Sequence, residues 1–231
     1  TLTGTRSIDA YPGYQFGAHD AEVPRGTSYF GGAEQTDATG QAVIDAALPD
    51  IDLDGWPATV NLTLRLREGS GRPVERRLSQ PVMTEGTKIG IKPLFDDVLP
   101  EGTEARFEVV TLGDGDTPVP RPVEWEMNRV QTRYQWYQLY GNWNWEPVTT
   151  RTRIASGTAI TTDGRLSVAE PVEWGEYELV VSETEGDFTR SSVSFYAGWY
   201  GGGEAGDSPD RLEMSLDRDG YAIGDTAMLR V

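Results

Sequence analysis

Three acidic side chains at alternate positions are the part of the sequence that most resembles a metal site: Asp50, Asp52 and Asp54. They are spaced like the first ligands of a calcium-binding EF-hand loop, and Gly55 occupies the sixth position, where such a loop turns sharply. The twelfth position holds Asn61 instead of the bidentate glutamate, and a strand-like pattern replaces the exiting helix. The stretch favours an acidic loop between strands, with calcium binding as the alternative.

Catalytic residue types are scarce. The chain has one histidine, His19, and no cysteine, so a nucleophile–base triad lacks most of its parts and His19 reads as a surface or packed residue. Glu124 and Glu126 alternate around Trp125 on one strand, whereas glycosidase carboxylates must flank a cleft about 5–10 Å apart. We expect no enzyme and no cofactor. The absence of cysteine also excludes disulfides and zinc–thiolate sites within these residues.

Aromatic residues gather in the middle of the chain, and five of the seven tryptophans lie there. The candidates for structural or interface roles are Trp125, Tyr134, Trp136, Trp143, Trp145, Trp174 and Tyr177. A row of exposed indoles would suit sugar stacking, but packing in a core or between domains is the commoner use of such rings. We therefore expect Trp125 and Trp136 to be largely buried, within a hairpin that supplies a domain core and a face toward a neighbour.

The elements that would position these residues are all strands. Residues 123–139 and 143–155 read as a long hairpin that turns at 140–142. Residues 58–67 alternate, with Val60, Leu62, Leu64 and Leu66 on one face, which we expect to be buried, and residues 74–82 return as the partner strand. Further strands are expected at 42–48, 88–92, 105–112, 159–161, 165–168, 174–181, 188–197, 212–216 and 227–231. The fold class is all-β, with tandem antiparallel β-sandwich domains.

Charge and hydropathy exclude two classes of partner. Twenty basic and 37 acidic residues give a net charge of −17, which argues against nucleic acid, because phosphate is neutralised by clustered lysine and arginine. No run of about 18 apolar residues is present, so we expect no membrane contact by these residues.

Several motifs resemble the bacterial alpha-2-macroglobulin family, in which immunoglobulin-like macroglobulin domains follow one another. The resemblance covers nearly the whole chain. It rests on Glu68 to Arg76, Ile89 to Asp96, Arg133-Tyr134-Gln135-Trp136-Tyr137, Glu173-Trp174-Gly175-Glu176-Tyr177, Phe195-Tyr196-Ala197-Gly198-Trp199-Tyr200, and Asp217 to Val231. It implies a large periplasmic parent protein that traps proteases in bacterial defence, and leaves a lipid anchor of that parent open.

The resemblance also implies a division into four parts. Residues 1–83 would form a macroglobulin-like sandwich that lacks its first strands, and residues 84–200 a complete one that carries the aromatic hairpin. Residues 201–210 read as a glycine-rich linker. Residues 211–231 would be the truncated opening strands of a third, bait-region domain.

The function implied is that of a structural scaffold fragment of a broad-spectrum protease inhibitor. The family's thioester needs a cysteine followed closely by Glu-Gln, and Glu34-Gln35 has no such cysteine, so neither thioester nor bait is expected here. The partners implied are the other domains of the parent chain and, through the full-length protein, its target proteases. The alternative is a carbohydrate-binding or adhesin-type sandwich. An exposed planar row of tryptophans would favour that alternative, and buried tryptophans would favour the scaffold.

Overall fold

The computed structural model describes residues 1–29, 35–67, 71–96, 99–199 and 214–230. Within this part the regular structure is antiparallel strands and one short 3-10 turn, Asp114–Asp116, so the all-β prediction is confirmed. The same residues contain no helix that is long and apolar enough to cross a membrane.

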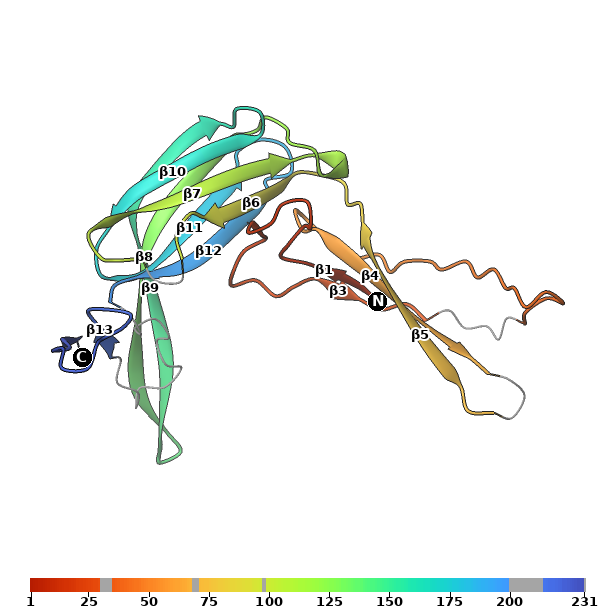
Figure 1. Cartoon of the computed structure of the whole chain (residues 1–231), viewed down its shortest axis with the longest axis horizontal. Helices are drawn as coiled ribbons and strands as arrows, with labels where there is room; N and C mark the ends of the chain where they lie inside the picture. Colours follow the sequence, from red (N-terminus) through yellow and green to blue (C-terminus); the bar gives the residue numbers. More distant parts are fainter. Residues whose placement is uncertain (30–34, 68–70, 97–98, 200–213, 231) are drawn as a thin grey trace.

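Two four-stranded sheets face each other in the larger body (Figure 1). One sheet has the order β10 (Arg165–Val172), β7 (Thr103–Leu112), β6 (Lys88–Pro93) and β2 (Gln15–Phe16). The other has the order β12 (Arg190–Ala197), β11 (Gly175–Glu183), β8 (Pro122–Leu139) and β9 (Asn142–Ile160). We call this body the second sandwich.

The core of the second sandwich follows from alternation along its strands. Tyr177, Leu179 and Val181 share one face of β11, as the sequence predicts, and all three are buried in the main core. On the opposite sheet Phe107 is fully buried, and its ring centroid lies 5.3 Å from that of Phe95. Such edge-on aromatic contacts add to the stabilisation that burial itself provides.

The short strand β2 extends the second sandwich although it comes from the start of the chain. Phe16 pairs with Gly90 of β6, and its ring is fully buried against Val110 and Leu112. A Cβ atom at Gly90 would lie 2.8 Å from the Phe16 ring, so this close approach requires glycine at position 90. The division between the first two domains stays a prediction, and the N-terminal segment contributes strands to both bodies.

The N-terminal sheet has the order β3 (Arg25–Gly26), β1 (Leu2–Gly4), β4 (Ala58–Leu66) and β5 (Val74–Val82). The predicted hairpin 58–82 is present, in register from Ala58 with Val82 to Leu66 with Val74. The expectation that its apolar face is buried is wrong for the far half, because Leu64 and Leu66 are 52% and 56% exposed. The hairpin extends away from the second sandwich, and no second sheet of the described residues covers it there (Figure 1).

The strand expected at 42–48 is also wrong. These residues pair with no neighbouring strand in the described structure, and Val43 is 91% exposed. A strand needs a neighbouring strand for its backbone hydrogen bonds. The short apolar run Val43–Ile44 does not by itself bring such a strand alongside.

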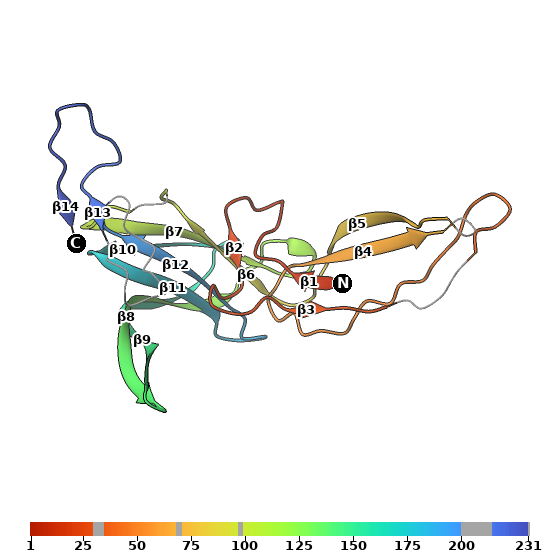
Figure 2. The same ribbon diagram turned by 90° about the horizontal axis from the view of Figure 1, so that it is seen from below.

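The end of the chain forms a small separate pair, β13 (Ser215–Leu216) with β14 (Leu229–Arg230). These strands lie within the predicted segments 212–216 and 227–231. The predicted linker 201–210, residues 211–213 and Val231 lie outside the described residues. Seen from below, the strand pair and the β8–β9 hairpin leave the second sandwich on opposite sides (Figure 2).

Candidate interaction site

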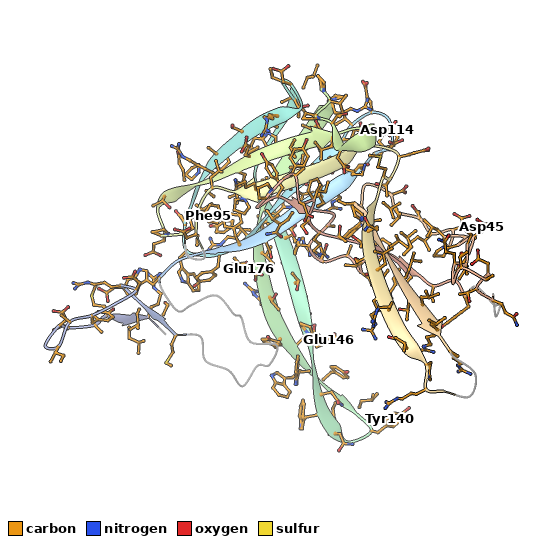
Figure 3. All side chains as sticks on the ribbon, turned by 45° about the vertical axis from the view of Figure 1, so that its right-hand side comes forward. Asp45, Phe95, Asp114, Tyr140, Glu146 and Glu176 are labelled. Carbon is orange, nitrogen blue, oxygen red and sulfur yellow. The ribbon has the colours of Figure 1, made fainter. Side chains whose placement is uncertain are left out.

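The β8–β9 hairpin continues far beyond the sandwich to which it belongs. β11 pairs with β8 only from Val123 to Val130, whereas the β8–β9 ladder continues to Leu139 and Asn142. Tyr140 and Gly141 close the hairpin with φ values of +52° and +83°, as a two-residue turn of mirror type requires. Figure 3 shows Tyr140 at the tip, with Glu146 further up the second strand. Residues 131–150 are therefore a two-stranded ribbon outside the sandwich.

One face of this ribbon is aromatic. Tyr134 pairs with Pro147, Trp136 with Trp145, and Gln138 with Trp143. Cross-strand partners point to the same side of a ribbon, and every second residue shares that side. The aromatic face consists of Tyr134, Trp136, Trp143, Trp145 and Pro147.

Much of the aromatic face is open to solvent. Trp136 is 50% exposed and Trp143 is 69% exposed, so the expectation that Trp136 is buried is wrong. Trp125 is partly buried and packs against the main core, because it lies where β8 still belongs to the sandwich. Trp125 and Trp136 differ in solvent exposure because two strands alone cannot bury one of their faces, whereas a second sheet packed against them can.

The rings of the aromatic face do not all lie in one plane. Tyr134 and Trp145 meet edge to face, with centroids 5.2 Å apart and planes at 84°. A sugar ring stacks on aromatic faces that lie side by side in one plane, and this crossed pair interrupts such a plane. Exposure thus favours a binding surface, and ring geometry favours an irregular partner such as a protein over a planar glycan.

The β4–β5 hairpin is basic although the chain is strongly acidic. Residues 58–82 contain five arginines and two glutamates, an excess of three positive charges on a chain whose net charge is −17. The projecting ribbon 131–150 contains one arginine and one glutamate and so has no net charge. The arginines at its base, Arg151 and Arg153, are paired with carboxylates of this chain. A partner surface with an acidic excess therefore complements the β4–β5 hairpin.

The segment after β2 anchors the hairpin's base to the N-terminal part of the chain. His19 donates its backbone N–H to Ser192 Oγ at 3.0 Å, and its Nδ1 lies 2.7 Å from the same oxygen. Its Nε2 lies 3.8 Å from the buried carboxylate of Glu178. Ser192 and Glu178 are both buried, so this serine–histidine–glutamate group is a packing contact between two parts of the chain.

We call the contacts of His19 with Ser192 and Glu178 the junction. Glu178 also connects the junction to β8 and β9. Asn128 Nδ2 donates to Glu178 at 3.0 Å, and Arg151 Nε donates at 3.1 Å. Arg151 reaches Asp20 as well, at 3.1 Å, so one arginine bridges the hairpin's base and the N-terminal segment. A buried carboxylate with several donors avoids the large cost of an unpaired buried charge. Sequence reasoning missed this junction, because its members are up to 173 residues apart and no local pattern links them.

The acidic stretch at 50–54 lies in the loop that leads to β4. Asp54 donates its backbone N–H to Asp52 Oδ1 at 3.0 Å, as in an ordinary Asx turn. The hydrogen bond with the Asp52 side chain, followed by the charge of that carboxylate, raises the pKa of Asp54. Among the described residues, no group of three or more histidine, cysteine, aspartate or glutamate side chains is placed to hold a metal ion.

Comparison with protein families gives two matches in series. The bacterial alpha-2-macroglobulin MG5 domain matches residues 1–84, and bacterial macroglobulin domain 6 matches residues 90–199. This chain belongs to the bacterial alpha-2-macroglobulin family. The aromatic face and the junction partners Glu178 and Ser192 fall in the domain 6 match, and His19 falls in the MG5 match.

Alpha-2-macroglobulins of known sequence are similar along almost the whole chain. One from Xylella fastidiosa is 31% identical over 242 residues, and one from Escherichia coli is 26% identical over 259 residues. Both alignments cover 97% of this chain, and they cover 14% and 15% of the respective relatives. The macroglobulin fragment thus spans about one seventh of the length of these relatives.

Solved structures of alpha-2-macroglobulins are similar to almost the whole chain. A Salmonella alpha-2-macroglobulin reacted with methylamine gives a TM-score of 0.64 at 27% identity. The native conformation of the Escherichia coli protein gives 0.62 at 25% identity. Each likeness covers 99% of this chain, and it covers 15% and 16% of those chains.

Proposed function

We propose that this chain is a scaffold module of a bacterial protease inhibitor, and that the aromatic face is the surface on which another domain of the same polypeptide packs. The observation that carries the proposal is a row of half-exposed to exposed indoles on a ribbon that no other part of the described chain covers. Large aromatic side chains in that position mark an interface more often than a free surface.

The partner is a neighbouring macroglobulin-type domain of the parent. The relatives are about seven times as long as this chain, so most surfaces of such a parent lie outside these residues. The basic β4–β5 hairpin fits a surface with the acidic excess that the rest of this chain itself has. The far half of the β4–β5 hairpin, with Leu64 and Leu66 exposed, is a second surface that fits another domain.

In this proposal the fragment is not an enzyme, and it holds neither the bait nor the thioester. The absence of cysteine from the whole sequence supports the second statement, because a thioester forms from a cysteine thiol. Protease trapping then belongs to the full-length protein, and a periplasmic location, with or without a lipid anchor, is part of the same proposal. Fractionation of cells that express the parent tests the location.

A carbohydrate-binding module is the second candidate, because Trp136 and Trp143 are exposed. Stacking of a glycan on these indoles would change their fluorescence on titration with soluble oligosaccharides. We expect no such change, because the crossed rings of Tyr134 and Trp145 leave no planar row.

The scaffold function is tested by protease assays on the fragment and on its parent. We expect a stoichiometric dose of the full-length protein to slow cleavage of a large protein substrate by trypsin or elastase. We expect the purified chain 1–231 to leave that cleavage unchanged and to hydrolyse nothing itself, because these residues hold no bait or thioester. Inhibition by the fragment alone would show that the inhibitory chemistry lies within these residues. A full-length protein that does not inhibit either protease would contradict the proposal that the parent is a protease inhibitor.

A further inference from the structure

Arg230, in the last strand, is surrounded by three side chains of the second sandwich. Its guanidinium carbon lies 4.7 Å from the Trp199 ring centroid and 5.7 Å from that of Trp174. Its two terminal nitrogens donate to the two carboxylate oxygens of Glu101, at 2.7 Å and 3.3 Å. Trp199 Nε1 donates to Glu101 as well, at 3.2 Å, which orients the carboxylate.

This combination of contacts is particular to arginine. A planar guanidinium can pair with both oxygens of a carboxylate and stack on aromatic faces at the same time, whereas a lysine ammonium is a point charge. The side chains of Arg230 and Glu101 are 36% and 33% exposed, so the pair is partly shielded from solvent. Partial shielding weakens screening by salt, and the indoles add a cation–π attraction.

The other side chains of the described C-terminal segment make their contacts within that segment. Asp217 accepts hydrogen bonds from the Tyr221 hydroxyl at 2.6 Å and from the Met228 backbone at 2.8 Å. Arg218 lies over the Tyr221 ring and pairs with Asp217 and Asp225. Within the described residues 214–230, Arg230 makes the side-chain hydrogen bonds and the ion pair that join this segment to the second sandwich.

We propose that Glu101, Trp174 and Trp199 form an arginine socket, which holds the strand pair β13–β14 on the second sandwich through Arg230. The socket accepts a guanidinium group carried by a β-strand. Its three members come from the β6–β7 connection, the residue before β11 and the residues after β12. Their convergence fixes the direction in which the polypeptide continues past the second sandwich. This assignment does not depend on the proposed function, because it concerns contacts within the chain.

A distance measurement in the intact chain tests the socket. The sequence has no cysteine, so two cysteines introduced by Ile160→Cys and Ile223→Cys are the only sites for spin labels, and both isoleucines are exposed. Pulsed electron spin resonance then reports the distribution of distances between β9 and the C-terminal segment. We expect one narrow distribution for the labelled chain and a broad one after Arg230→Ala or Trp199→Ala.

Two further variants separate the socket from a general effect of charge. Arg218→Ala is the matched control, because Arg218 also stacks on a ring and pairs with carboxylates, but within its own segment. It should leave the distribution narrow. Arg230→Lys keeps the charge and loses the planar fork, so it should broaden the distribution as Arg230→Ala does. The socket would be overturned by a broad distance distribution in the doubly labelled chain that carries no further substitution. It would equally be overturned by a narrow distribution after Arg230→Ala and Trp199→Ala.

The socket should also open in acid. The hydrogen bond from Arg230, followed by its charge, lowers the pKa of Glu101 below its ordinary value of 4.5. The contribution of the ionised carboxylate is then complete above that ordinary value and is lost as pH falls through the lowered pKa. The distance distribution should broaden over this acidic range in the labelled chain. In Glu101→Gln it should be broad at every pH, and a narrow distribution in this variant would contradict the role of the carboxylate.

Discussion

Replacement of Phe16 by alanine is expected to lower the free energy of unfolding by about 3–5 kcal/mol, the usual cost of removing a buried phenylalanine ring. Phe16 is fully buried against Val110 and Leu112, and its ring lies on the backbone of Gly90. The ring joins the start of the chain to the second sandwich, so its loss should also weaken the nearby contact of His19 with Ser192. Domains of ordinary stability have only about 5–15 kcal/mol in total.

Urea unfolding followed by tryptophan fluorescence measures this change. Tyr29→Ala is the control from the same N-terminal segment, because Tyr29 is 92% exposed and should change stability by no more than about 0.5 kcal/mol. Equal and small effects of Phe16→Ala and Tyr29→Ala would mean that β2 does not belong to the second sandwich.

The second large effect is expected at Phe107, in the core between the two sheets. Its ring centroid lies 5.3 Å from that of Phe95 and 5.2 Å from that of Phe195, and it is fully buried. Phe107→Ala leaves a cavity among these rings and should cost about 3–5 kcal/mol. The thermal midpoint should fall by several degrees as a result.

Phe188→Ala is the matched control for this substitution. Phe188 is 70% exposed and has a φ of +55°, and alanine keeps the Cβ atom that strains such a backbone. Its effect should therefore stay within about 0.5 kcal/mol. If calorimetry gave the two phenylalanine variants the same midpoint, the packing of the two sheets described here would be incorrect.

The sequence predicted the strands best where alternation and turn residues agree. Val74–Val82 has the predicted bounds, and the long aromatic hairpin turns at the predicted residues. The buried face of β11 follows from Tyr177, Leu179 and Val181 at every second position. At β11 the local pattern is sufficient because a strand in a two-layer fold has one face against the core. At β5 and the aromatic hairpin the turn residues place the strands without a covering layer.

The sequence could not show which apolar faces remain uncovered. Trp125 and Trp136 lie on the same strand with similar neighbours, yet only Trp125 has a second sheet opposite it. The same applies to Leu64 and Leu66 on β4. The contact of His19 with Ser192 and the pairing of Arg230 with Glu101 join residues more than 100 positions apart, and a single sequence holds no record of such pairs.

The most direct test of the interface role is to compare the reactivity of Trp136 and Trp143 in this chain and in the full-length parent. Hydroxyl-radical footprinting, read residue by residue by mass spectrometry, reports how accessible each indole is. Both indoles should react readily in the chain 1–231, in keeping with their exposure of 50% and 69%. In the parent they should be protected, because another domain packs on the aromatic face. Equal reactivity of both tryptophans in the fragment and in the parent would contradict the proposed interface.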